Sequence, residues 1–197
     1  MKSFWHCLLL TVSCLLLKSC VKEPIREDAP EQITKVILTF TPVDGGTPVV
    51  VSATDPDGEG VEDITADGTI NLMPGKTYTL QLSLINELAD VTSPQYDVTS
   101  EVEEEGQEHL FFFSFTNNLF SAPSGNGNID NRGDEIDYKD SDGTNPIGLI
   151  TQWKASSITG VGTFRIMLKH QPQLKSASST SADGETDLDL TFEIEVM

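Results

Sequence analysis

Two histidines are the side chains whose types and positions best suit metal chemistry. Each stands at the end of an alternating apolar row, in which His109 precedes Phe111, Phe113 and Phe115, and His170 follows Phe164, Ile166 and Leu168. Alternation of this kind places one row on the core face of a β-strand. If the two strands are antiparallel neighbours, both imidazoles reach the same end of the domain. A histidine pair with a carboxylate from Glu105 or Glu108 would suit Cu²⁺ or Zn²⁺. The competing interpretation is two separate rim histidines, each hydrogen-bonded to the backbone.

Three acidic, glycine-containing segments could instead bind Ca²⁺, which prefers six to eight oxygen ligands on a tight loop. The segments are 55–63, 137–145 and 183–189. The best candidate ligands are Asp140, Asp142 and Asn145, grouped around Gly143. Because no segment carries a full ligand run with a terminal bidentate Glu, ordinary Asp-Gly turns are the alternative for all three.

Catalytic signatures are absent from the sequence. It has no Gly-x-Ser-x-Gly motif of the kind that marks a nucleophilic serine in hydrolases. Beyond the first twenty residues only His109 and His170 remain as imidazole bases, and no cysteine remains as a nucleophile. Carboxylates are too numerous for one glycosidase pair to stand out. We therefore expect a protein that is not an enzyme.

The first twenty residues read as an export signal that ends in a lipidated cysteine. Lys2 supplies a positive start, residues 8–17 are almost wholly apolar, and the small residue Ser19 precedes Cys20. This is the three-part pattern of a secretory signal peptide. The apolar run stops at Lys18, short of the ~20 residues that a spanning helix needs.

Residues 17–20 (LKSC) resemble the lipobox of bacterial lipoproteins, in which cleavage precedes a cysteine that carries diacylglycerol. Lys18 departs from the small or apolar residue usual there. The resemblance implies a signal peptide at 1–19 and lipidation of Cys20. The alternatives are cleavage to a secreted, unlipidated protein, and a less suitable cysteine at Cys14.

Composition limits the partners of the chain. The 31 acidic and 12 basic side chains give a net charge of −19. Such a field repels nucleic acid and anionic lipid headgroups, so neither is expected as a partner surface. The remaining 178 or so residues are enough for one core without disulfides, which favours a single domain.

Period-two patterning governs the chain after a polar tether. We expect residues 20–32 to form an acidic, extended tether and residues 33–197 to form one domain. Strands are expected near 36–40, 49–53, 70–72, 78–84, 109–115, 148–153, 163–170 and 187–196. In the last, even-numbered residues 188–196 should face inward and Asp187, Asp189, Thr191, Glu193 and Glu195 outward.

One helix and one long loop interrupt the strands. Residues 97–105 predict a short polar helix with a Ser100–Glu103 capping box and Gly106 at its end, serving as a crossover rather than a core element. Residues 117–146, rich in Gly, Asn, Asp and Ser, predict a long loop that is functional, disordered, or both.

About eight short strands with almost no helix predict an all-β fold. We expect an antiparallel β-sandwich of immunoglobulin-like or related Greek-key type, with a closed barrel as the alternative. An outer-membrane barrel is disfavoured because the polar rows are densely charged.

The chain as a whole is similar to a group of small bacterial lipoproteins of unassigned activity. The similar segments are 77–86, 108–113, 146–153, 165–172 and 185–192. Members are often labelled "type 1 periplasmic binding fold", which implies a two-lobed α/β receptor. One short helix cannot cover a parallel sheet, so the sequence argues against that fold. The resemblance implies an exported, anchored β-domain and no site residues.

These observations predict a lipid-anchored β-sandwich at the outer membrane, on its periplasmic or cell-surface face. Its expected role is a non-enzymatic binding or accessory module for an envelope protein or small ligand. The alternatives are a protein that binds or delivers a divalent metal (Cu, Zn or Ca) and a carbohydrate-binding domain that uses Tyr96, Phe120, Tyr138 or Trp153.

Overall fold

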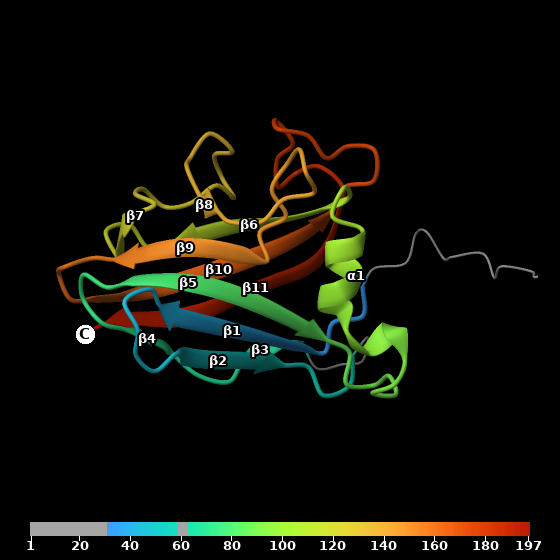
Figure 1. Ribbon diagram of the computed structural model, residues 1–197, viewed down its shortest axis with the longest axis horizontal. Helices are drawn as coiled ribbons and strands as arrows, with labels where there is room; N and C mark the ends of the chain where they lie inside the picture. Colours follow the sequence, from blue (N-terminus) through green and yellow to red (C-terminus); the bar gives the residue numbers. More distant parts are fainter. Residues whose placement is uncertain (1–30, 59–62) are drawn as a thin grey trace, which may run out of the picture.

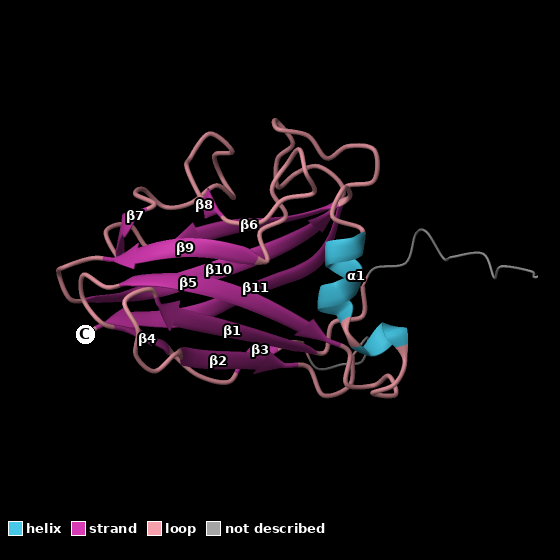
Figure 2. Ribbon diagram, in the orientation of Figure 1, coloured by secondary structure: helices cyan, strands magenta, loops and turns pink. Residues whose placement is uncertain are grey.

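The computed structural model describes residues 31–58 and 63–197, which form two facing β-sheets with a short helix at one end (Figures 1 and 2). The expected signal peptide, Cys20 and the tether as far as residue 30 lie outside the described residues. The fold confirms the predicted β-sandwich.

The larger sheet has seven antiparallel strands. Six of them run in the order β3 (Thr65–Ala66), β2 (Val49–Thr54), β1 (Lys35–Pro42), β5 (Thr77–Ile85), β9 (Ile150–Ala155) and β7 (Phe120–Ala122). The seventh, β8 (Asp137–Tyr138), also pairs with β9. Strand β1 pairs with β5 in antiparallel register, with Lys35 opposite Ile85 at one end and Pro42 opposite Tyr78 at the other. This register keeps the apolar rows of both strands on the face that looks into the sandwich.

The smaller sheet has four strands in the order β4 (Ile70–Leu72), β11 (Glu185–Val196), β10 (Gly160–His170) and β6 (His109–Phe115). Only β4 and β11 are parallel. Eleven strands therefore occur among the described residues, against about eight expected. The additional strands are too short to show an alternation of apolar and polar residues; β3 and β8, for example, have two residues each.

Aromatic side chains fill the space between the sheets. Trp153 is fully buried, with its ring centroid 5.0 Å from that of Phe164 and 5.5 Å from that of Phe113. The indole N–H of Trp153 donates to the Thr151 hydroxyl at 2.7 Å, which satisfies the one polar atom of the ring. Phe120 joins this cluster and is also buried. The core therefore uses two of the aromatic residues that a carbohydrate platform would need.

Helix α1 (Val98–Glu104) lies across the end of the sandwich, between the end of β5 and the start of β6 (Figure 1). Its N-cap is Asp97, whose side chain accepts from the Ser100 N–H, so the predicted Ser100 cap is wrong by three residues. Val98 and Val102 are buried in the main core. The helix thus closes the apolar interior where the strands stop. It is a core element as well as a crossover.

The segment 117–146 covers the outer side of the smaller sheet. Asn128 accepts a hydrogen bond from the Phe113 N–H and donates to the Tyr138 hydroxyl, which donates to the Phe111 carbonyl. These bonds satisfy the free edge of β6, which would otherwise expose unpaired backbone groups. Beneath the segment, Leu110, Phe112, Ile129 and Met167 form a second apolar cluster. Burial raises the pKa of Tyr138 to about 12. The expected long loop is therefore a packed cover that includes β7 and β8.

Candidate metal-binding site

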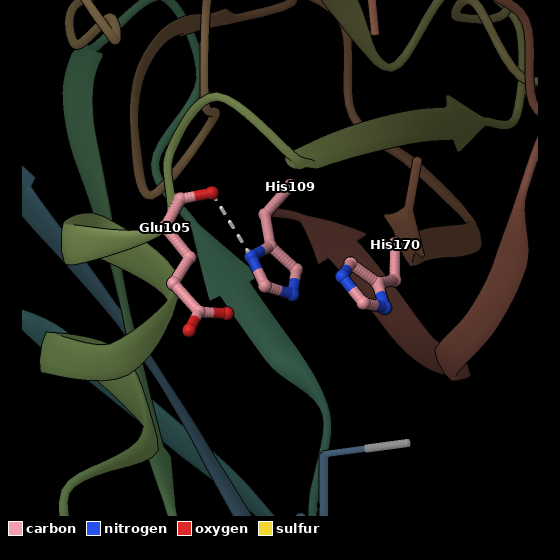
Figure 3. A group of neighbouring side chains, drawn as sticks. All are labelled: Glu105, His109 and His170. Carbon is pink, nitrogen blue, oxygen red and sulfur yellow. Dashed lines mark hydrogen bonds between the residues drawn. The ribbon is translucent and has the colours of Figure 1, made fainter. Parts of the chain in front are cut away.

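The two histidines meet at the end of the sandwich beside α1. His109 is the first residue of β6 and His170 the last of β10, and the register pairs them directly. Their imidazole rings stack with centroids 4.8 Å apart and an interplanar angle of 13° (Figure 3). The two strands are thus antiparallel neighbours, as the convergence of the apolar rows required. Separate rim histidines, the alternative interpretation, do not occur.

Hydrogen bonding fixes which nitrogen of His109 carries the proton. Nδ1 lies 3.3 Å from the backbone carbonyl oxygen of Glu105, at the end of α1 (Figure 3). A carbonyl only accepts, so Nδ1 is the N–H donor and Nε2 of the neutral ring bears the lone pair. The His109 side chain is fully buried, and Nε2 has no hydrogen-bond partner among the described residues. Burial, with the charge of His170, lowers the pKa of His109 to about 4.

Asp187 is the residue of this site that sequence reasoning missed. The β10–β11 register shifts beside Lys169, where Leu168 faces Leu188 but Lys169 faces Thr186, so Asp187 is an extra residue in β11. A bulge of this kind turns a side chain to the other face. The Asp187 side chain is fully buried instead of outward as predicted, with Oδ2 3.8 Å from His109 Nε2. The inserted residue follows only the polar Glu185 and Thr186 in β11, so no apolar row precedes it to reveal the change of phase.

Neither carboxylate oxygen of Asp187 has a hydrogen-bond partner among the described residues. Such a buried, unpaired charge is costly, and burial raises the pKa of Asp187 to about 6.

Glu31 brings a second carboxylate to the same nitrogen. Its Oε1 lies 3.8 Å from His109 Nε2, and its side chain is mostly buried. Burial, followed by the charges of Glu101, Asp187 and Glu105, raises the pKa of Glu31 to about 8. The next residue, Gln32, accepts a hydrogen bond from the Asn86 side chain. The last two residues of the expected tether therefore pack against the domain.

The two predicted carboxylate partners occupy different positions. Glu105, His109 and His170 offer ligand atoms that all lie within 4.8 Å of one another. Burial raises the pKa of Glu105, and the charges of Glu101 and Glu108 add to the effect. Glu108 instead holds His170, with Oε2 3.2 Å from Nε2. Glu105 thus belongs to the cluster, whereas Glu108 orients one of its histidines.

The β10–β11 loop keeps His170 and Asp187 in position. The fully buried Gln171 donates from its side chain to the carbonyls of Thr180 and Asp183, which shapes the loop. Gly184 has a φ of +73° and lies against the carbonyl of His170, where a Cβ would collide with the backbone. Only glycine fits this close approach in the left-handed region. The contact between Gly184 and the His170 carbonyl therefore holds the start of β11, just before the bulge, in place.

The predicted calcium ligands have structural roles. Asp140 accepts the N–H groups of Gly148 and Ile150, one with each oxygen. Asp142 accepts those of Thr144 and Asn145 with Oδ1, and its Oδ2 lies 3.1 Å from the Lys175 ammonium. Backbone N–H groups already donate to these carboxylate oxygens, and the buried Lys175 ammonium lies beside those of Asp142. Asp140, Asp142 and Asn145 therefore do not form an oxygen cage, which argues against calcium there.

The described part of the first acidic segment and the start of the third are turns, whereas residues 185–189 of the third belong to β11. Asp55 accepts from the N–H groups of Asp57 and Gly58, and Asp183 accepts from the N–H and hydroxyl of Thr180. Both patterns are ordinary turn chemistry. Residues 59–62 of the first segment lie outside the described residues.

Comparison of the chain with family models, with curated proteins and with solved structures gave no match. Within residues 31–58 and 63–197, no helix has the length and apolar character required to cross a membrane.

Proposed function

We propose that the chain is an exported lipoprotein of the outer membrane, anchored through Cys20, whose β-sandwich is a non-enzymatic module that binds another envelope protein. The support for the anchor is the leader at residues 1–19 and the cysteine that follows it. The support for binding is a group of exposed apolar side chains on the end of the sandwich that lies away from the tether.

The chain enters the sandwich at the α1 end. Glu31 contacts His109 there, and β1 then runs toward the opposite end (Figure 1). That opposite end carries the turns after β1, after β4 and after β9. A tether attached at residue 31 would therefore leave these turns directed away from the anchor.

Four large apolar side chains are exposed on these turns or, for Val161, at the start of β10, and we call them the distal apolar surface: Val43, Met73, Ile158 and Val161. Ile158 is 75% exposed. Isolated exposed apolar residues need no explanation, but a group on adjoining turns is typical of a protein interface. The Lys76–Asp44 ion pair, 2.6 Å long, supplies a polar rim.

Backbone hydrogen bonds join the turns that carry the distal apolar surface. The Gly75 N–H donates to the Ser156 carbonyl at 2.8 Å, and the Val43 N–H donates to the Thr77 carbonyl at 2.9 Å. The Ser156 hydroxyl accepts the Ile158 N–H, which holds the exposed side chain on a defined turn. A preorganised surface binds with a smaller entropic cost than a mobile one.

Metabolic labelling with an alkyne fatty acid tests the anchor. We expect label in the wild-type chain and in Cys14→Ala, and none in Cys20→Ala, because only the cysteine at the cleavage site would be acylated. Equal labelling of Cys20→Ala would contradict the proposal.

Site-specific photocrosslinking in cells tests the binding surface. A photoreactive residue at Ile158 should give a discrete protein adduct. The same residue at Leu174, which is also exposed but lies in the loop after β10 at the α1 end, is the matched control. Equal adducts from both positions, or none from either, would count against the distal apolar surface as the interface.

Carbohydrate binding is less well supported. Phe120 and Trp153 are buried in the core, and Tyr138 uses its hydroxyl to close the edge of β6. Stacking on a sugar needs an exposed aromatic face, and of the four candidates Tyr96 alone is half-exposed without such a role.

A further inference from the structure

Three potential metal-ligand atoms converge at the α1 end of the sandwich. The lone pair of His109 Nε2 faces Asp187 Oδ2 and Glu31 Oε1, each 3.8 Å away. Both distances exceed a hydrogen bond, so none of the three atoms satisfies another. With a pKa of about 8 Glu31 keeps its proton at neutral pH, whereas the His109 Nε2 lone pair and the Asp187 carboxylate are both electron-rich. Buried groups of one polarity repel strongly at low dielectric. A cation placed among them would reverse the sign of every one of these interactions.

The spacing suits one shared metal ion. Two ligand atoms that each lie about 2.0–2.1 Å from Zn²⁺ are about 3.3 Å apart at the tetrahedral angle and about 4 Å apart when opposite. The 3.8 Å separations fall between these limits. His170 adds a second imidazole, stacked on His109, and the ligand atoms of these two histidines and Glu105 all lie within 4.8 Å of one another. Small side-chain rotations would bring these atoms to coordination distance.

The surroundings of His109 match those of a metal-binding histidine. Its Nδ1–H donates to the Glu105 carbonyl, which directs the Nε2 lone pair into the cluster. A hydrogen bond from the second ring nitrogen is the usual means by which proteins orient a metal-bound imidazole. His170 has a comparable support in Glu108.

We propose that His109, His170 and Asp187 bind a divalent transition metal of the Zn²⁺ class at the α1 end of the sandwich, with Glu31 as the fourth ligand. Two imidazoles and two carboxylates form a mixed N/O set that Zn²⁺ accepts in four-coordinate geometry. The unpartnered, fully buried side chain of Asp187 distinguishes this site from an ordinary acidic surface. Since Glu31 adjoins the tether, a bound ion would also fasten the start of the domain to β6 and β11.

Titration of the full-length lipidated chain in detergent with Zn²⁺ at neutral pH tests this site. Millimolar Mg²⁺ in the buffer occupies weak surface carboxylates. We expect one Zn²⁺ per chain. Asp187→Asn and His170→Gln should each weaken binding by about 10- to 100-fold, and Glu31→Gln should weaken it by a smaller factor. Glu193→Gln, at an exposed position of the same strand, is the matched control and should bind as the wild type does.

Asp187→Asn preserves the shape of the side chain, so circular dichroism and thermal unfolding of the metal-free variant can establish that it folds. In the wild type, Zn²⁺ should raise the unfolding temperature, and this rise should be lost in Asp187→Asn. Absence of a stoichiometric site would overturn the proposal. So would wild-type affinity in Asp187→Asn, even if His170→Gln weakens binding.

Discussion

His170 lies directly opposite His109 in the β6–β10 pair, and their rings stack with centroids 4.8 Å apart. A positive charge on one imidazole therefore repels a positive charge on the other. Burial of His109 and the charge of His170 together lower the pKa of His109 to about 4, and burial has the larger effect. The pair is thus held with His109 neutral at physiological pH, which is the form that a metal ion binds.

Asp187 should make the stability of the metal-free protein depend on pH. Its folded pKa of about 6 lies above the ordinary value of 3.8, so the folded state binds this proton more tightly than the unfolded state does. The resulting stability is fully present below pH 4 and is lost as the pH rises through 6. Relative to Asp187→Asn, which does not titrate, the wild type should lose roughly 2–3 kcal/mol between pH 4 and pH 7.

Urea unfolding at several pH values in the presence of a chelator measures this difference. Glu193→Gln should follow the wild type across the range, because its position is exposed. Parallel curves for Asp187→Asn and the wild type would contradict the buried position of the carboxylate.

Lys175 and Asp142 form a buried ion pair that joins two loops to the end of α1. The two side chains are 1% and 5% exposed, and Nζ also donates to the carbonyl of Gly106. Burial lowers the pKa of Lys175 against the opposing effect of Asp142. Lys175→Met should reduce the free energy of unfolding by about 3 kcal/mol, because it leaves the Asp142 carboxylate without its cation.

Chemical denaturation measures this loss, and Lys154→Met is the control. Lys154 is exposed on β9, so its substitution should change stability by less than about 0.5 kcal/mol. The double variant Lys175→Met/Asp142→Asn should be more stable than the sum of the single changes predicts, since neither charge is then left unpaired. Additive losses would contradict a coupled pair.

Local pattern was sufficient to predict the longer strands, and it predicted the meeting of the histidines on the condition that their strands are antiparallel neighbours. The alternation of β11 from Leu188 to Val196 and the apolar rows that end at His109 and His170 are properties of neighbouring residues, so the face of each side chain follows from its position. Placing both histidines at one end required only that β6 and β10 be antiparallel neighbours.

The rest of the site depends on relationships that no short window contains. Asp187 faces inward because of a one-residue bulge, and Glu31 belongs to a polar segment that reads as a tether. Asp142 resembles a calcium ligand until Lys175, 33 positions away, is found beside it. Leu110 and Phe112 occupy the outer face of β6 and are buried only because the segment 117–146 covers them.

The edge of β6 should weaken when the Tyr138 hydroxyl is removed. That hydroxyl donates to the Phe111 carbonyl at 2.7 Å and accepts from Asn128 at 3.0 Å. Tyr138→Phe leaves both partners buried without a replacement, at an expected cost of about 1–3 kcal/mol. The Phe113 N–H donates to Asn128 Oδ1, so its hydrogen–deuterium exchange should become faster in this variant.

Tyr96→Phe is the matched control for this change, because Tyr96 is half-exposed and lies outside both β6 and the segment 117–146. It should leave both stability and exchange unchanged. Equal effects of the two substitutions would show that segment 117–146 is not held through Tyr138.

Two glycines with similar backbone angles should respond very differently to alanine. Gly45 has a φ of +87° and nothing within 4 Å of a Cβ, so Gly45→Ala should cost only about 1 kcal/mol of left-handed strain. Gly184 has a φ of +73°, but its Cβ would meet the His170 carbonyl, and that backbone cannot rotate away. Gly184→Ala should therefore cost at least about 3 kcal/mol and displace the end of β10 from the bulge in β11. Urea unfolding compares the two variants, and the histidine NMR resonances should shift in Gly184→Ala alone. Equal losses of stability would mean that β11 does not start in contact with His170, and the buried position of Asp187 would then lose its structural basis.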